Sequence, residues 1–149
     1  MEFIEILKEI KVPVTIVHVV SVVIGMGAAL MSDVLFSFFS KDKKLNKTEI
    51  FTLEILSKVV FYTLFIICIS GILIFLTDIG KYSNSTKFLS KMSILFLLIL
   101  NGYVLNTYIW PHLLGKKFFI LKKEKSVRRL AFVCGSISII SWLSVLGLG

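Results

Sequence analysis

The chain has 149 residues, of which 56% are hydrophobic and 17% charged, and it contains 13 Phe but only 2 Pro and 9 Gly. This composition excludes an ordinary soluble globular domain and leaves little material for linkers or a second domain. The formal net charge is +8. Its basic residues are divided among the segments that flank apolar stretches, so they favour a membrane protein and argue against a nucleic-acid partner.

The first eleven residues, MEFIEILKEIK, precede the first apolar stretch. They mix acidic and basic residues, unlike the basic start of a signal peptide, and the apolar stretch that follows is longer than a signal peptide requires. Phe3, Ile4, Leu7 and Ile10 recur at helical spacing. The pattern predicts a short amphipathic helix at the membrane interface, before Pro13 opens the first span.

Four apolar stretches then follow, at residues 12–39, 55–77, 92–115 and 130–149. A bilayer core roughly 30 Å thick requires about 20 residues of helix, and each stretch meets that length. The predicted fold is all-α: an integral membrane protein in which residues 1–149 form one domain, an antiparallel four-helix bundle. The lipid bilayer is therefore its expected partner, and the sequence leaves a homodimer open.

The connecting segments lie on alternate sides of the predicted membrane, and most of their basic residues are in the first and third segments. The first segment holds four Lys, and the third, at 116–129, holds seven Lys and Arg. The positive-inside rule places both in the cytoplasm. We therefore expect a multi-pass protein of the bacterial cytoplasmic (inner) membrane with both termini outside. Within the 116–129 loop, Phe118, Phe119 and Ile120 lie among the cations, which predicts contact with anionic lipid.

The first span is the richest in polar and small residues. On a helical wheel of about 100° per residue, one face collects six of them: His18, Ser21, Gly25, Ala29, Ser32 and Asp33. This face is expected to point into the bundle, because small residues let helices approach and polar residues find partners away from lipid. We interpret the Ser, Gly and Ala residues as packing positions. His18 and Asp33 are candidates for either function or structural pairing.

Depth decides which polar residues can meet. In the third span, Asn101, Tyr108 and His112 share one face of the wheel. His18 should lie about 8 Å below the outer surface, and Asp33 about 30 Å below it, near the cytoplasmic end where His112 emerges. Asp33 and His112 are therefore predicted to form a polar pair near Tyr108, with Asn101 as a polar packing residue. His18 and His112, roughly 20 Å apart, cannot ligate one metal ion or haem iron in a monomer.

The outer end supplies the preferred candidate site. There His18 is expected to lie level with Lys91 of the third span, and roughly level with Ser70, Gly71 and Trp142. The two cysteines, Cys68 and Cys134, are expected at different depths and are interpreted as free thiols; Cys134 forms a predicted packing edge with Ser138 and Ser141. CxxC, HExxH and glycine-rich phosphate motifs are absent from the sequence, which argues against the familiar hydrolase and nucleotide chemistries.

Three sequence segments resemble those of a known superfamily: HVVSVVIGMGAA (18–29), ISGILIF (69–75) and SKMSILFLLIL (90–100). They look like the four-helix membrane superfamily that contains the copper-resistance D-type proteins and the bacterial four-helix protoporphyrinogen oxidases, over residues 14 to 110. The resemblance implies a b-type haem or a copper site near the outer side, with His18 as the cofactor and metal ligand and Lys91 as a second cofactor-binding residue. In those oxidases an arginine stands near the position of Asp33, and a further histidine near Asn101.

Three functions remain open from the sequence. The first is a haem- or porphyrin-binding protein that uses His18 as the iron ligand, with enzymatic activity left undecided. The second is an assembly or interaction protein without chemistry of its own, whose polar residues serve only helix association. The third is a transporter for a metal or small solute, with His18, Asn101 and Asp33 at successive depths along a polar path.

Overall fold

The structure, a computed structural model, describes residues 2–39, 46–109, 111 and 124–148. In chain order the described elements are α1 (Glu2–Glu9), α2 (Lys11–Phe39), α3 (Lys47–Thr77), α4 (Ile79–Ser83), α5 (Thr86–Val104), the π-helical turn η2 (Leu105–Ile109) and α7 (Glu124–Gly147). Four segments are long and apolar enough to cross a membrane: Lys11–Phe39, Lys47–Thr77, Thr86–Ile109 and Arg129–Gly147. The predicted all-α, multi-pass membrane bundle is confirmed.

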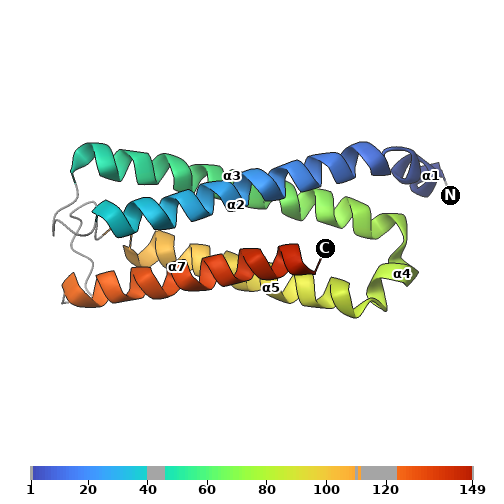
Figure 1. The fold of residues 1–149 in the computed structure, drawn as a ribbon. Coiled ribbons are helices and arrows are strands. Elements are labelled where there is room, and N and C mark those ends of the chain that lie inside the picture. The colour runs from blue at the N-terminus through green and yellow to red at the C-terminus, as the bar shows by residue number, and fades with distance from the viewer. Residues whose placement is uncertain (1, 40–45, 110, 112–123, 149) are drawn as a thin grey trace.

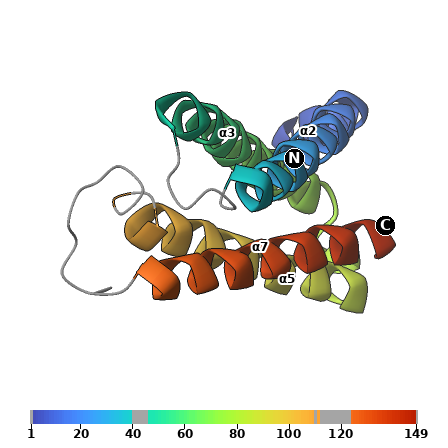
Figure 2. The same cartoon turned by 60° about the vertical axis from the view of Figure 1, so that its left-hand side comes forward.

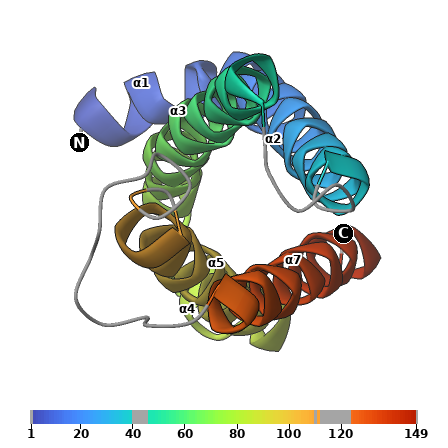
Figure 3. The ribbon, with the colours of Figure 1, turned by 90° about the vertical axis from the view of Figure 1, so that its left-hand side faces the viewer.

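The long helices form two antiparallel hairpins. Figures 1 and 2 show α2 and α3 as one layer, with α5 and α7 lying against it as the second. Seen from one end, α2 lies beside α7 and α3 beside α5 (Figure 3). The α2–α3 pair packs most extensively, and α2 also contacts α7. The α3 and α5 backbones approach each other less closely, and these helices meet through side chains, with Phe75 stacked on Phe88 and with Ile67 and Leu98 in one core cluster.

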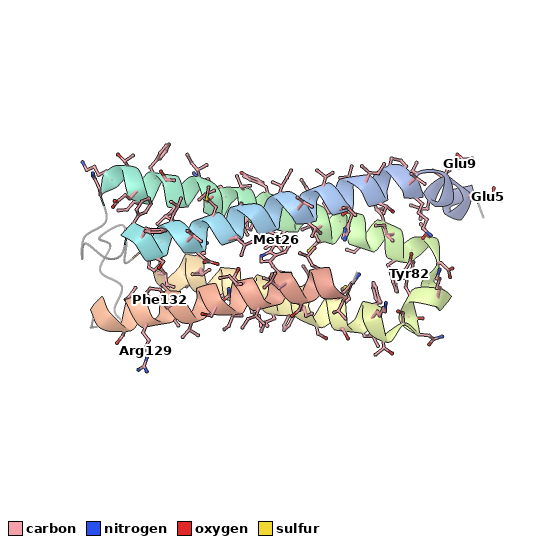
Figure 4. The ribbon with its side chains drawn as sticks, in the orientation of Figure 1. Glu5, Glu9, Met26, Tyr82, Arg129 and Phe132 are labelled. Atoms are coloured by element: carbon pink, nitrogen blue, oxygen red, sulfur yellow. The ribbon has the colours of Figure 1, made fainter. Side chains whose placement is uncertain are left out.

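The two ends of the bundle differ in their local structure. At the end that carries α1 and α4, here called the α4 end, the ring of Phe88 lies 5.0 Å from that of Phe75 and 5.9 Å from that of Tyr82. The Lys11 ammonium lies 6.0 Å from the centre of the Tyr82 ring, so the start of α2 joins the same group. Figure 4 shows Glu5, Glu9 and Tyr82 at this end and Arg129 at the other, here called the Phe39 end.

The helix boundaries follow local capping chemistry. α3 begins at Lys47, ahead of the apolar stretch that starts at 55, because Asn46 and Glu49 form a reciprocal capping box. The Asn46 side chain accepts a hydrogen bond from the Lys47 backbone N–H at 2.7 Å, and Glu49 accepts one from the Asn46 backbone at 2.7 Å. The predicted N-terminal helix is confirmed as α1, and it packs on α3 with Leu7 buried.

The bundle core confirms the predicted inward face of α2. Ser21, Gly25 and Ala29 are all buried. A Cβ added to Gly25 would lie 2.6 Å from Thr63 Oγ1 of α3 and 3.2 Å from the Trp142 ring of α7. Three helices meet here because residue 25 has no side chain. Met26 points between the two layers and packs against the same core (Figure 4).

Two expectations for α7 have different outcomes. Its predicted packing edge is confirmed, since Cys134, Ser138 and Ser141 are all buried. Trp142, expected level with His18, instead lies against Gly25, about two turns farther along α2. The register of α7 against α2 explains the difference: Gly135 lies against Asp33, so Trp142, seven residues later on the antiparallel helix, comes level with Gly25.

Candidate functional site

His18 is held by α3 near the α4 end. Its Nδ1 lies 2.8 Å from Ser70 Oγ, and its Cε1 would lie 3.6 Å from a Cβ placed on Gly71. The predicted proximity of His18 to Ser70 and Gly71 is therefore confirmed. Lys91 of α5 is close enough for its charge to act on the imidazole. We call His18, Ser70 and Lys91 the His18 cluster.

The hydroxyl of Ser70 links His18 to the α3 backbone. Ser70 Oγ lies 2.6 Å from the Ile66 carbonyl oxygen and 2.8 Å from His18 Nδ1. A hydroxyl has one hydrogen to donate, so donation to the Ile66 carbonyl goes with a proton on His18 Nδ1, and donation to His18 goes with an unprotonated Nδ1. The direction of the hydrogen bond between His18 and Ser70 therefore depends on the tautomer of the imidazole.

The metal-binding potential of the His18 cluster is limited to one histidine. Within residues 2–39, 46–109, 111 and 124–148, no three His, Cys, Asp or Glu side chains lie close enough to hold a metal ion together. Ser70 lines a cavity of about 330 Å³ whose other lining residues are apolar, but His18 does not line it. The described geometry therefore offers an isolated imidazole and no built metal centre.

Asp33 occupies a different place, toward the Phe39 end. A Cβ added to Gly135 of α7 would lie 3.1 Å from Asp33 Oδ1, so the carboxylate packs directly against the α7 backbone. Asp33 Oδ2 is fully covered and has no hydrogen-bond partner within the described part of the chain. Its predicted partner, His112, lies outside the described residues, as does most of the 116–129 loop.

A cavity of about 610 Å³ opens beside Asp33. All four long helices line it, with Asp33 from α2, Lys58 and Cys68 from α3, Asn106 from η2 and Ser138 from α7. Most of the remaining lining is apolar or aromatic. Its size and composition are typical of small-molecule sites, which are mainly apolar with a few placed polar groups. We call it the Asp33 cavity.

The lining of the Asp33 cavity includes exposed side chains of α3 and α5. The exposed fraction is 69% for Phe61, 63% for Tyr62 and 64% for Tyr103. The cavity therefore reaches the surface of the bundle beside these residues, on helices that are long and apolar enough to cross a membrane.

The position of α5 is fixed by Asn101. Its Nδ2 donates to the Cys134 carbonyl oxygen at 2.9 Å in a buried setting, which ties α5 to α7. The π-helical turn follows at Leu105–Ile109. The spacing of about 100° per residue assumed for the predicted alignment of Tyr108 with Asn101 does not apply within this turn, and His112 lies outside the described residues. π-Helical turns occur frequently at functional sites, and this one places Asn106 in the cavity lining.

The fold defines a multi-pass helical membrane protein with an internal cavity beside Asp33. Comparison with known proteins gave no match: no family model, curated protein or solved structure is similar to this chain. The resemblance to the copper-resistance D-type superfamily therefore stays a prediction.

Proposed function

We propose that this protein binds a small lipophilic molecule, taken from the bilayer, in the Asp33 cavity. The observation that carries the proposal is the cavity of about 610 Å³, lined by all four long helices and by exposed side chains of α3 and α5. A bundle that served only to associate helices gains nothing from such a space, because unfilled interior volume loses packing contacts. This function belongs with the transporter reading of the sequence, with binding as its first step.

The distribution of basic residues supports an orientation for this function. The Lys-rich segment between α2 and α3 and the 116–129 loop follow the positive-inside rule if the Phe39 end faces the cytoplasm of a bacterial inner membrane. Both termini would then lie outside. In this orientation the Asp33 cavity belongs to the cytoplasmic half of the bilayer.

Two glycines allow a matched test of the proposed function. A Cβ meets no atom within 4 Å at either Gly102, which lines the cavity, or Gly27, which does not. We expect Gly102→Phe to weaken binding of the neutral lipophilic dye N-phenyl-1-naphthylamine about tenfold or more, because the added ring fills the site. Gly27→Phe should bind like the parent protein.

The readout is saturable energy transfer from Trp142 to the dye in purified protein. The chain has 2 Trp, so a Trp110→Phe background leaves Trp142 as the sole donor. Equal saturable transfer in both phenylalanine variants, or its absence from the parent protein, would contradict the proposed function.

Haem binding at His18 is a second candidate, favoured by the hydrogen bond between His18 Nδ1 and Ser70 Oγ. Such a bond leaves Nε2 free to ligate iron and fixes the ring, as in many metal-binding histidines. Lys91 would supply a cation for a porphyrin propionate. The residues provide one protein ligand, and His18 does not line the Asp33 cavity.

This candidate predicts a Soret band shifted from that of free haem when haem is added to the purified protein. His18→Ala should abolish the shift, and Ser70→Ala should weaken haem affinity about 10-fold or more. Absorption spectra that are the same for the parent protein and both variants would exclude haem ligation by His18.

A further inference from the structure

We infer that the molecule held in the Asp33 cavity is a lipophilic organic cation, an inference that rests on the ligand-binding function proposed above. Such a molecule carries one positive charge surrounded by apolar or aromatic groups. The charge balance, the contacts of the Asp33 carboxylate and the aromatic lining each support it.

Among the described residues, two charged side chains line the cavity, and one negative charge is left without a partner. The charged side chains are Asp33 and Lys58. The Lys58 ammonium lies 2.8 Å from Glu54 Oε1, one turn earlier on α3, and Glu54 is not part of the lining. The positive charge of Lys58 is therefore already paired with a residue outside the cavity. The charge of Asp33 then makes the cavity interior negative.

One oxygen of the Asp33 carboxylate is buried without a hydrogen-bond partner in the described part of the chain. The other oxygen packs against the Gly135 backbone, which offers no side-chain donor. An unpaired ionised group is unfavourable in a low-dielectric interior, and a cationic ligand removes much of that cost. An anionic ligand of the same shape would add repulsion.

The aromatic lining indicates an organic cation and not an inorganic one. Five aromatic side chains line the cavity, namely Phe36, Phe61, Tyr62, Phe65 and Tyr103. Ring faces attract bulky cations through their quadrupole. A bare metal ion instead requires several oxygen, nitrogen or sulfur ligands, and the described residues do not gather three such acidic, Cys or His groups.

A pair of ions of nearly equal size and opposite charge tests the inference. Tetraphenylphosphonium and tetraphenylborate are each used to displace N-phenyl-1-naphthylamine from the full chain in detergent. We expect the parent protein to prefer the cation about tenfold or more, and Asp33→Asn to reduce that preference to near equality while still binding the neutral dye. Asn matches the size of Asp, so the packing against Gly135 is kept.

Glu54→Gln provides a second variant away from the cavity interior. It unpairs Lys58 and adds a positive charge to the lining, so tetraphenylphosphonium should bind more weakly while dye binding stays unchanged. Glu54 is partly exposed, and its replacement removes no core contact. Unchanged cation affinity in this variant would overturn the inference.

Failure of the inference can be separated from failure of the proposed function. If the dye binds as proposed but the parent protein binds both ions equally, as expected were Asp33 already neutralised by His112, only the cationic ligand is excluded. A cation preference that persists in Asp33→Asn would likewise exclude recognition of a cation by Asp33 and leave the proposed ligand binding in place. If Gly102→Phe leaves dye binding unchanged, the cavity is not the site and both proposals fail.

Discussion

Gly25→Val is expected to lower the free energy of unfolding by about 3 kcal/mol, the upper part of the usual range for overpacked cores. Even a single added carbon would lie 2.6 Å from Thr63 Oγ1 and 3.2 Å from the Trp142 ring. Thr63 cannot move away easily, because its hydroxyl donates to the Val59 and Val60 carbonyl oxygens at 2.8 and 2.9 Å. The measurement is reversible unfolding in mixed detergent micelles.

Gly27→Val is the matched control for Gly25→Val. The two glycines belong to the same helix, but a Cβ on Gly27 meets no atom within 4 Å. The same substitution should therefore change the free energy of unfolding by no more than about 0.5 kcal/mol. Similar losses in the two variants would show that helix packing at Gly25 is not as described.

Trp142→Ala is expected to cost about 3–5 kcal/mol, the range measured when large aromatic residues are removed from cores. Trp142 is only 2% exposed and packs with Ala29, Ile67 and Leu98, which belong to the three other long helices. Removing the ring leaves a void where all four helices meet, and the loss of packing contacts is not compensated by lipid. Thermal unfolding in detergent measures the effect.

Trp142→Phe separates ring packing from the indole N–H. The Nε1 of Trp142 is buried and has no hydrogen-bond partner among the described residues. Phenylalanine keeps much of the ring and removes an unsatisfied donor, so the cost should be only about 1 kcal/mol. If Trp142→Phe destabilises as strongly as Trp142→Ala, the indole N–H has an energetically important partner.

Sequence patterns predicted the elements of the fold and several of their faces. Span length and apolar composition are local properties, so four membrane-crossing helices could be predicted residue by residue. The helical wheel identified the buried face of α2, including Ser21, Gly25 and Ala29. Depth counting also brought His18 to Ser70, since helix rise is nearly constant along straight segments.

The Asp33 cavity could not be predicted in the same way. A helical wheel shows which side of α2 is polar, but not how far α3 stands from α5. That separation depends on contacts between distant segments, such as the bond from Asn101 to the Cys134 carbonyl. The residues of η2, LNTYI, include no proline or glycine that would indicate an irregular helical turn. The Glu54–Lys58 pair could have been found from its spacing of four.

The uneven joining of the hairpins has a mechanical consequence. The layers meet along α2 and α7, at Gly25 with Trp142 and at Asp33 with Gly135, and α3 meets α5 at the α4 end through Phe75 and Phe88. A small movement of α3 relative to α5 would therefore be greatest toward the Phe39 end, away from the stacked rings. Such a movement would change the width of the Asp33 cavity while the contacts between α2 and α7 are kept.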